Sequence, residues 1–545
     1  MPPDWSPRAV PDDLRARYWR EGLWTDDTLG ELLGTALTEH AELDFRIWSN
    51  ARPFHSTLGA VYARARGLAA GLRARGVGPG DVLAFQLPNW WEAAATFWGA
   101  AALGAVLVPV VHFYGPKELG YILRESRAKG LITADRFGHL DYLAGLDIVR
   151  PDAPDLELVV VVPAEPGAPA PAGMVAFEEV AAHDPLDGPL AVDPDAPAVV
   201  GYTSGTTSDP KGVVHTHRTL TAEVRQLMGI HAPGDRPMLV GAPVAHAIGM
   251  LAGLLGPPYR AQPVHLIDVW EPAAVLNAMV EADLTAGSGA TFFCQSLLDD
   301  PGFGPEHIKR MRHLGMGGAA VPAAFADRAE GMGIGIARAY GSTEHPSTTG
   351  STWDLPREKR NHTDGRPMAG VEVRLVDDSG RDVPRNAPGE IWSRGPDLFV
   401  GYTNPALTKE AVDADGWYAS GDIGVLDADG FLTITDRKKD IIIRGGENVS
   451  AAEVEELLVR MPGVAEAAAV AAPDARLGEH VCAFVRRAPD ADPPDLNAVR
   501  GHLEAAGLAR QKWPEELHIV DELPRTPSGK VKKFVLREAL RSQHQ

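Results

Sequence analysis

Short apolar runs alternate with longer amphipathic stretches through the first third of the chain. The runs VLAFQLP at 82–88, GLITA at 130–134 and LELVVVVP at 156–163 have the length and the β-branched content of buried strands. The stretch at 58–76, which precedes them, is rich in Ala, Leu and Arg and has the composition of a helix. Helices that alternate with strands predict an α/β fold built in layers around a sheet.

One uncharged segment, residues 93–116, is long enough to resemble a membrane span because it contains no Asp, Glu, Lys or Arg. Gly99, Gly104 and Pro109 interrupt it, so we expect an alanine-rich helix followed by a short Val/Leu strand. Such a pair is typical of a helix packed on a buried parallel sheet. The segment is therefore predicted to lie in the core, and no transmembrane segment is expected.

The character of the sequence changes twice in the second half of the chain. Residues 370–436 combine β-formers with turn dipeptides, which predicts antiparallel strands in a β-barrel-like subdomain. After Asp436 the pattern returns to helices and strands, enough for a small α+β domain. We therefore predict a large N-terminal domain of layered α/β subdomains at 1–436 and a small, mobile C-terminal domain at 437–545.

Composition and charge narrow the class of protein. A chain of 545 residues, 45% hydrophobic and 23% charged, is too long for one hydrophobic core. The formal net charge of -21 argues against nucleic acid or an anionic membrane as a partner. The two cysteines, Cys294 and Cys482, offer neither a disulfide framework nor a metal-ligand spacing, which favours a reducing compartment. The first residues lack the apolar run of a signal peptide, so we predict a cytoplasmic protein.

The most distinctive polar stretch is YTSGTTSDPKG at 202–212. Hydroxyl side chains and the bare amides of a glycine-rich turn donate hydrogen bonds to an anion, and a lysine adds a point charge, so the stretch suits a phosphate cradle. Its composition fits a polar surface loop equally well. The Walker pattern is excluded, because Gly212 follows Lys211 where that pattern requires Ser or Thr.

Further motifs follow this loop in order over nearly the whole chain. They are PVAHAIG at 243–249, GMGGAAVP at 315–322, AYGSTEH at 339–345, GEIWSRG at 389–395, GWYASGD at 416–422, DRKKDIIIRGGENVSAAEVE at 436–455 and PRTPSGKVKK at 524–533. With the polar loop they resemble the acyl-adenylate-forming superfamily, which includes acyl-CoA synthetases, coumarate-CoA ligases, luciferases and peptide-synthetase adenylation domains. The sequence YGSTEHPSTTG resembles bacterial ligases of the medium-chain and cyclohexanecarboxylate type.

The resemblance implies a two-step reaction, because a carboxylate needs a good leaving group before a thiol can replace it. A carboxylic acid and ATP would give an acyl-adenylate and pyrophosphate, and coenzyme A would then give acyl-CoA and AMP. The expected pocket walls, which include Ser288–Thr291, His345 and Pro346, are small or apolar and predict a medium-sized nonpolar acid. The alternatives are a ligase that loads a carrier protein, a luciferase-like oxygenase and a nucleotide-binding pseudoenzyme.

The resemblance also assigns residues to ATP and to coenzyme A. The polar loop would hold the phosphates, the small residues after 316 would line the adenine and acyl pocket, Asp422 would accept the ribose hydroxyls, and two later glycines would line a passage for pantetheine. The residues expected to bind these cofactors are Thr203, Ser204, Gly205, Thr206, Thr207, Lys211, Gly317, Gly318, Ala319, Tyr340, Gly341, Ser342, Asp422, Arg437, Gly445 and Gly446.

Four residues are expected to take part in catalysis on the same ground. Lys530 would reach the carboxylate and the α-phosphate, Thr343 would approach the α-phosphate, and Glu344 would be a ligand of Mg²⁺. His246 would gate the acyl pocket, although a packed core histidine explains it nearly as well. The small domain would turn about Lys439 between the two steps.

Some features of the sequence receive no assignment. His215 and His217 stand two apart on an expected strand, but no third ligand accompanies them and no metal is assigned. Ile443 and Asn448 stand where plant and beetle relatives carry Lys and Gln, so the roles of those two positions stay open. A homodimer is also left open.

Overall fold

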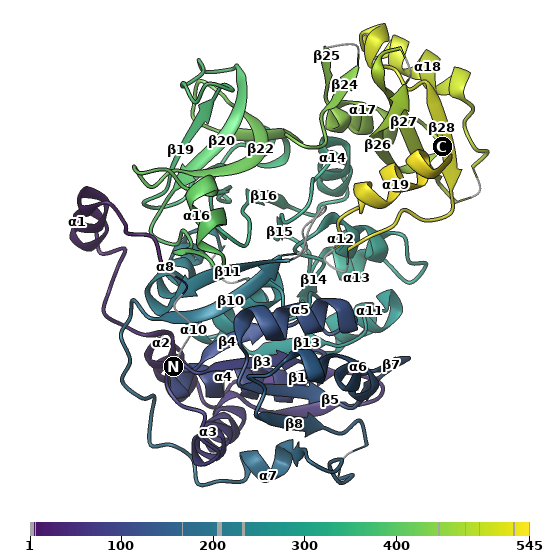
Figure 1. The fold of residues 1–545 in the computed structure, drawn as a ribbon. Coiled ribbons are helices and arrows are strands. Elements are labelled where there is room, and N and C mark those ends of the chain that lie inside the picture. Colours follow the sequence, from purple (N-terminus) through teal and green to yellow (C-terminus); the bar gives the residue numbers. More distant parts are fainter. Residues whose placement is uncertain are drawn as a thin grey trace.

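The computed structural model describes residues 5, 7–165, 167–203, 210–231, 235–444, 447–474, 476–489, 491–526 and 529–543. Figure 1 shows an α/β body in the lower half, a β-rich part above it on the left, and a separate group of C-terminal elements above it on the right. The predicted α/β class, with a large N-terminal part and a small C-terminal part, is confirmed.

An eight-stranded sheet forms the centre of the body. Its strands, in pairing order, are β21 (Gly401–Tyr402), β11 (Lys211–Thr216), β10 (Pro197–Thr203), β4 (Val106–Pro109), β3 (Val82–Gln86), β5 (Gly130–Ala134), β8 (Leu158–Val162) and β9 (Val175–Ala176). The strands from β10 to β9 pair in parallel, whereas β11 pairs antiparallel with both β10 and β21. The polar loop joins β10 to β11, so it begins at the carboxyl end of a central parallel strand, where ligands bind in open α/β sheets.

A second sheet of five strands shares a buried core with the first through the helices between them. Its strands, in order, are β14 (Thr285–Ala286), β12 (Met238–Val240), β13 (Val264–Ile267), β1 (Asp44–Trp48) and β2 (Phe54–Thr57). The helices of this core are α2 (Leu29–Glu39), α3 (Leu58–Ala74) and α4 (Trp91–Leu103).

The uncharged segment at 93–116 lies in this core, as predicted. Every residue of α4 is buried, and the helix ends at Gly104, whose φ of +71° is the left-handed conformation that glycine tolerates. Close contact with α3 needs a glycine at position 99, because an added Cβ would lie 2.6 Å from the carbonyl oxygen of Ala65. The segment is therefore a helix and a strand, not a membrane span.

The remaining helices of the body cover the sheets. They are α1 (Asp12–Arg20), α5 (Pro116–Ser126), α6 (Tyr142–Val149), α7 (Phe177–Ala181), α8 (His217–Leu227), α9 (Ala247–Met250), α10 (Gly256–Tyr259), α11 (Pro272–Glu281), α12 (Thr291–Leu298) and α13 (Pro305–Ile308). Thr216 is the N-cap of helix α8, because its hydroxyl accepts a hydrogen bond from the Thr219 amide.

Two smaller sheets follow. The first contains β15 (Leu314–Met316), β16 (Ile336–Tyr340), β17 (Thr349–Gly350) and β18 (Arg366–Pro367), and the second contains β19 (Glu372–Val376), β20 (Pro388–Arg394), β22 (Tyr418–Leu426) and β23 (Leu432–Arg437). Their helices are α14 (Ala323–Gly331), α15 (Arg357–His362) and α16 (Pro405–Ala411). The second sheet is antiparallel throughout and coincides with the stretch predicted as antiparallel strands.

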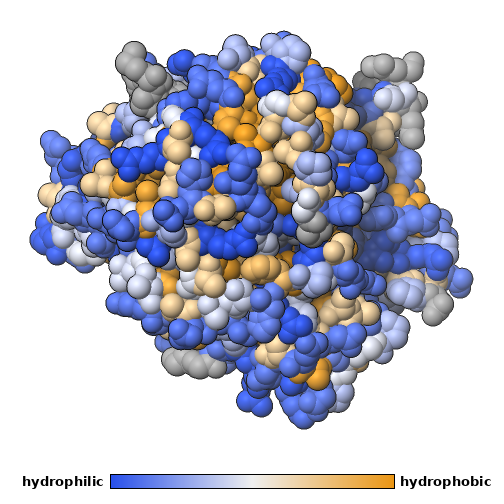
Figure 2. Space-filling model, turned by 90° about the horizontal axis from the view of Figure 1, so that it is seen from below, coloured by the Kyte–Doolittle hydropathy of each residue, from blue (hydrophilic) through white to orange (hydrophobic). Residues whose placement is uncertain are grey.

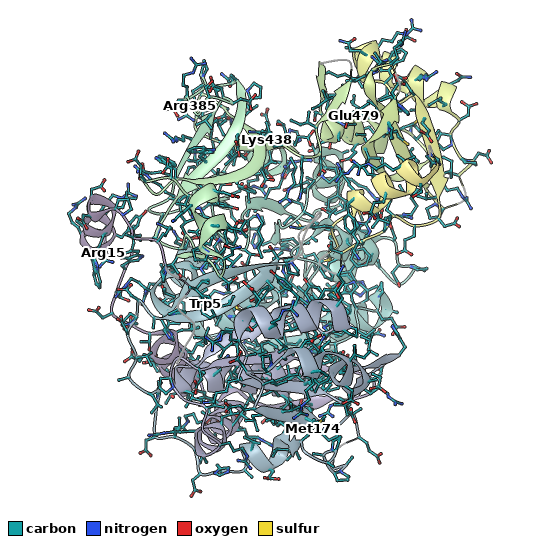
Figure 3. The ribbon with its side chains drawn as sticks, viewed as in Figure 1. Trp5, Arg15, Met174, Arg385, Lys438 and Glu479 are labelled. Carbon is teal, nitrogen blue, oxygen red and sulfur yellow. The ribbon has the colours of Figure 1, made fainter. Side chains whose placement is uncertain are left out.

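The C-terminal part has a sheet and two hydrophobic clusters of its own. Its strands are β24 (Ile442–Arg444), β25 (Glu447–Val449), β26 (Val464–Asp474), β27 (Gly478–Arg487) and β28 (Glu516–Val520), and its helices are α17 (Ala451–Val459), α18 (Leu496–Ala505) and α19 (Lys533–Gln543). Figure 3 shows Lys438 on the connection between the antiparallel sheet and the C-terminal sheet, which carries Glu479. The domain boundary after residue 436 stays a prediction.

The C-terminal part contacts the body through α14, above which α17 lies in Figure 1. Glu456 on α17 accepts hydrogen bonds from the backbone amides of Ala323 (3.2 Å) and Ala324 (3.4 Å). These residues begin α14, so the carboxylate faces the positive end of the helix dipole. Gly529 lies against Phe292, where an added Cβ would be 3.2 Å from the phenylalanine Cβ.

Among the described residues, none of the helices combines the length and the apolar character that a bilayer crossing demands. The face seen from below in Figure 2 carries hydrophilic side chains with apolar ones interspersed.

Candidate functional site

The flanks of the polar loop face each other across an antiparallel ladder. Thr203 ends β10 and pairs with Lys211, the first residue of β11. The Lys211 ammonium lies 5.2 Å from the centre of the Tyr402 ring. The four loop residues expected to bind phosphate, Ser204, Gly205, Thr206 and Thr207, lie outside the described residues.

Thr343 and Glu344 stand on the turn that follows β16, and neighbouring strands hold both. The Thr343 carbonyl is 2.7 Å from His215 Nε2 on β11. Burial lowers the pKa of His215 to about 4, so the ring is neutral at pH 7 and its Nε2–H donates to that carbonyl. The Tyr402 hydroxyl donates to Glu344 Oε1 at 2.8 Å, and the Phe399 amide donates to the Glu344 carbonyl at 2.8 Å.

Two glycines near this turn have no room for a side chain. Gly341 directly follows β16, and a Cβ there would lie 1.8 Å from the carbonyl oxygen of Pro346. Gly318, with a φ of +75°, follows β15, and a Cβ there would lie 2.3 Å from the Ile248 side chain. Close packing within the protein therefore excludes a side chain at both positions, and the expected role of Gly318 in the adenine and acyl pocket stays a prediction.

A second carboxylate is held on β22. Asp422 is 4% exposed; its Oδ2 accepts from the Tyr340 hydroxyl at 2.6 Å, and its Oδ1 is 2.8 Å from Arg437 Nε. The pairing of β22 with β23 aligns Asp422 with Arg437. Each carboxylate oxygen retains a further acceptor position, so this geometry suits a ligand with two hydroxyl groups.

Lys530 reaches the same place from the C-terminal part. Burial lowers the pKa of its ammonium to about 8, and the positive charge of Arg437 adds to the shift, while the charges of Asp422 and Glu344 oppose it. Burial lowers the pKa of His246 to about 4, and the charge of Lys530 contributes to that shift. The charges of Asp422 and Glu344 therefore act on Lys530, and the charge of Lys530 acts on a neutral His246.

The loop that presents Lys530 is closed by its own hydrogen bonds. The Lys530 amide donates to the Thr526 hydroxyl at 3.0 Å, and the Thr526 amide donates to the Lys530 carbonyl at 2.6 Å. Arg525 donates to the Gly529 carbonyl at 2.7 Å and pairs with Glu466 on β26. These bonds attach the backbone of the Lys530 loop to the C-terminal sheet.

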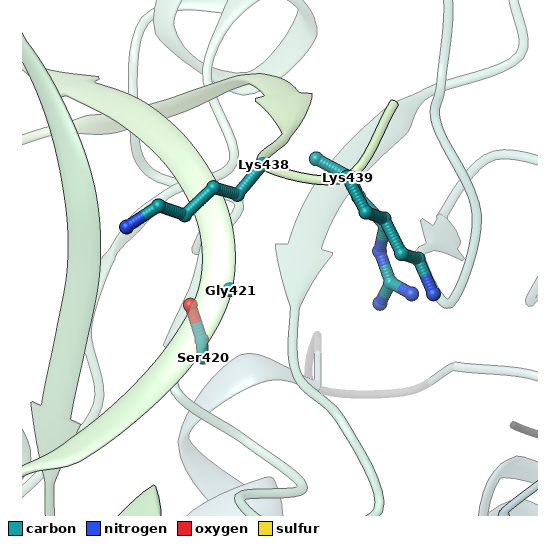
Figure 4. Close-up of a pocket in the computed structure, with 5 residues that line it drawn as sticks. Ser420, Gly421, Lys438 and Lys439 are labelled. Atoms are coloured by element: carbon teal, nitrogen blue, oxygen red, sulfur yellow. The ribbon is translucent and has the colours of Figure 1, made fainter. Parts of the chain in front are cut away.

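A pocket of about 360 Å³ lies at the connection between the two parts, lined by Ser420, Gly421, Arg437, Lys438 and Lys439. Figure 4 shows the side chains of Lys438 and Lys439 extending to opposite sides of the chain. Lys438 pairs with Glu390 at 3.1 Å, on the antiparallel sheet. Burial and the charge of Arg437 lower the pKa of Lys439.

Two family models match the chain at the parts that build this site. The model of the AMP-binding enzyme covers residues 40–403, and that of the AMP-binding enzyme C-terminal domain covers residues 453–530. The chain belongs to the AMP-binding enzyme family. The resemblance to acyl-adenylate-forming enzymes is thereby confirmed.

Curated relatives of this AMP-binding enzyme are acid–CoA ligases. The medium-chain fatty-acid–CoA ligase of Escherichia coli (strain K12) is 34% identical over 97% of this chain and 93% of its own length. A 3-[(3aS,4S,7aS)-7a-methyl-1,5-dioxo-octahydro-1H-inden-4-yl]propanoyl:CoA ligase of Rhodococcus jostii is 35% identical over 88% and 93%. A feruloyl-CoA synthase of an Amycolatopsis species is 34% identical over 92% and 94%.

Solved structures agree on the fold. The anthranilate CoA ligase AuaEII in complex with anthranoyl-AMP superimposes with a TM-score of 0.85, at 25% identity, over 95% of this chain and 98% of that one. ATP-bound MatB from Rhodopseudomonas palustris superimposes with a TM-score of 0.84, at 27% identity, over 95% and 100%. The chain is an AMP-forming acyl-CoA synthetase that uses ATP and coenzyme A, and the carrier-protein and luciferase-like alternatives are not favoured.

Mg²⁺ was expected at Glu344, and the residue present fits that ion. Its carboxylate is 8% exposed and supplies the hard oxygen ligands that Mg²⁺ prefers. Burial and the charge of Glu344 raise the pKa of Tyr402, so the phenol keeps its proton and can orient Oε1 as a donor. Glu344 is the residue that would hold Mg²⁺, which supplies charge neutralisation to bound phosphate.

Two sequence-based expectations about histidines are wrong. His345 was placed in the wall of the acid pocket, but its ring is 1% exposed and both ring nitrogens are bonded within the protein. His217 was placed on a strand with His215, whereas it is the first residue of α8, and its Nδ1 accepts from the Leu29 amide. A capping threonine at 216 was the signal that the strand had ended.

The sequence alone did not assign a role to Tyr402 or to His215, which hold the turn at 343 and 344. No local pattern shows that the Tyr402 hydroxyl meets a residue 58 positions away. Gly445 and Gly446, expected to line the pantetheine passage, lie outside the described residues.

Proposed function

We propose that this acyl-CoA synthetase activates a medium-sized nonpolar carboxylic acid, aliphatic, alicyclic or aryl, in two steps at one cleft. One observation carries the proposal: the loop of Lys530 packs against α12 of the large part through Gly529, and the charges of Asp422 and Glu344 act on the Lys530 ammonium. Three of the relatives named above are ligases for a medium-chain fatty acid, a bicyclic propanoate and ferulate, which supports a nonpolar acid.

In the first step, the acid attacks the α-phosphate and pyrophosphate leaves. We assign Asp422 and Arg437 to the ribose, and Lys211 with the polar loop to the pyrophosphate end. Thr343 and Lys530 stabilise the charge that develops on the α-phosphate oxygens and on the carboxylate. Mg²⁺, bound through Glu344, would neutralise phosphate charge.

In the second step, the thiol of coenzyme A attacks the acyl carbon and AMP leaves. We propose that the C-terminal domain turns about Lys439, which withdraws Lys530 and brings Gly445 and Gly446 to the adenylate. A cytoplasmic location and a homodimer stay predictions from the sequence.

The substrate is identified by a panel of acids. Release of pyrophosphate is measured with and without coenzyme A, for straight-chain acids of increasing length, cyclohexanecarboxylate, benzoate and charged dicarboxylates. We expect turnover with nonpolar acids and none with dicarboxylates. Failure of every acid to support exchange of labelled pyrophosphate into ATP would contradict the proposed function. Acyl transfer to holo carrier protein in place of coenzyme A would instead identify a ligase that loads a carrier protein.

The rate of adenylation should fall as the pH rises through about 8. Lys530 acts as a cation, and because its pKa is lowered to about 8, the free enzyme loses that charge as the pH passes this value. The profile of kcat/KM for ATP in the adenylation step reports this group. Lys530→Arg, which keeps its charge, should remove the alkaline limb, and an unchanged limb in that variant would assign the titration to another group.

A further inference from the structure

A cluster of buried polar side chains lies directly behind the turn that carries Thr343 and Glu344. His345 is 1% exposed, and Asp397 and Glu223 are both 0% exposed. They come from three separate places: the turn after β16, the segment between β20 and β21, and helix α8. Burial of three titratable groups is costly unless their hydrogen bonds and charges are satisfied.

The cluster is connected through both nitrogens of His345. Nδ1 is 2.8 Å from the Ser393 hydroxyl, at the end of β20, and Nε2 is 3.2 Å from Asp397 Oδ1. Ser347 extends the cluster, since its amide donates to Asp397 Oδ2 at 3.4 Å and its hydroxyl donates to Glu223 Oε1 at 2.7 Å. Burial raises the pKa of Glu223 well above its ordinary value, and the charge of Asp397 adds to the shift.

The same short segment that carries Asp397 also holds Glu344. Two residues beyond Asp397, the Phe399 amide donates to the Glu344 carbonyl, and Tyr402 donates to the Glu344 carboxylate. His345 therefore attaches the residue after Glu344 to the segment that grips Glu344 itself. Its own backbone closes the turn, because the Ser342 amide donates to the His345 carbonyl at 2.9 Å and the His345 amide donates to the Ser342 hydroxyl at 3.2 Å.

Space for the imidazole depends on a glycine. A Cβ at Gly395 would lie 2.8 Å from His345 Nε2 and 3.1 Å from Asp397 Oδ1. The ring thus occupies space that a side chain at 395 would need. Both ring nitrogens of His345 have hydrogen-bond partners, which a residue that only fills space does not require.

We propose that His345 is a positioning residue, which fixes the Thr343–Glu344 turn against the 393–402 segment through its bonds to Ser393 and Asp397. The inference rests on the function proposed above, because it concerns the geometry that Glu344 offers to Mg²⁺ and ATP. His345 itself touches no reacting atom in this arrangement. It acts on the adenylation step by keeping Glu344 and Thr343 in place, and a displacement of about 1 Å can lower a rate 10²-fold.

The test compares His345→Leu with His345→Gln and with His313→Leu. His313 forms a half-exposed pair with Asp235 at 2.7 Å, away from the proposed site, and serves as the matched control for loss of a His–Asp bond. Binding of ATP with Mg²⁺ is measured by calorimetry, adenylation by pyrophosphate exchange, and the second step with synthetic acyl-adenylate and coenzyme A.

We expect His345→Leu to weaken binding of ATP with Mg²⁺ at least fivefold and to lower the kcat of adenylation at least tenfold. The second step should stay within twofold, His345→Gln should recover part of both losses, and His313→Leu should match the wild type. Should His345→Leu fail to fold, Asp397→Asn keeps the shape and weakens the same bond, with a loss of about threefold to tenfold expected.

A folded His345→Leu or Asp397→Asn variant with wild-type nucleotide binding and adenylation would overturn the proposal. An equal loss in both steps would also overturn it, because a purely structural role affects both. Failure of the wild type to exchange pyrophosphate would contradict the proposed function instead, so the two failures are distinguishable.

Discussion

Lys530→Ala should lower the rate of acyl-adenylate formation by about 10² to 10³, the loss typical of removing a preorganised donor from a developing oxyanion. The side chain is the cation that the C-terminal part brings to Asp422 and Glu344, and its loop is fixed by bonds through Thr526 and Arg525. Exchange of labelled pyrophosphate into ATP, with an accepted acid, measures the loss.

The same variant should retain the second step. Synthetic acyl-adenylate and coenzyme A should give thioester at near the wild-type rate, because the proposed rotation withdraws Lys530 before thiol attack. Lys532→Ala, two residues along the same segment, is the matched control and should be close to wild type in both assays. An equal loss of both half-reactions in Lys530→Ala would show that the assigned role is wrong.

Glu344→Gln should give the second large effect, a loss of about 10² or more in adenylation, together with a higher Mg²⁺ concentration for half-maximal rate. Glutamine keeps the shape and can still accept the bond from Tyr402, but it removes the negative charge that a divalent cation requires. The rate of pyrophosphate exchange is measured as a function of Mg²⁺ concentration.

Tyr402→Phe is the graded comparison for Glu344→Gln. The ring stays beside Lys211, and only the donor to Oε1 is lost, so the effect should be smaller, about tenfold, in line with a hydrogen bond to a charged group. If Glu344→Gln kept the wild-type dependence on Mg²⁺, the assignment of this carboxylate to the metal would be refuted.

Much of the fold could be predicted because local patterns determine it. The segment at 93–116 shows why: Gly104 marks the end of α4, Pro109 ends β4, and the lack of charge matches the burial of both elements, although Gly99 lies inside the helix and does not interrupt it. The antiparallel sheet around 370–436 was equally visible, since turn dipeptides separate its strands. The resemblance to family motifs then predicted most of the residues of the candidate site.

The contacts between distant residues could not be predicted. The position of His345 after the AYGSTE motif predicted that it lines the acid pocket. Nothing in AYGSTEH shows that its ring forms a hydrogen bond with Asp397, 52 residues away. Glu223 is farther still, 124 residues before its partner Ser347. Such bonds depend on how three elements pack, whereas periodicity and motifs describe one element at a time.

The bonds between Glu456 and the first turn of α14 stabilise the arrangement in which the C-terminal part is docked on the body. Two partly buried bonds from a carboxylate to a helix N-terminus contribute about 1 to 2 kcal/mol together, which shifts the balance toward the docked arrangement about fivefold to thirtyfold relative to a chain without them. A rotation about Lys439 that separates α17 from α14 must break them. In the proposed mechanism, the docked arrangement receives the acid and ATP, and the rotation that admits coenzyme A requires these two bonds to break.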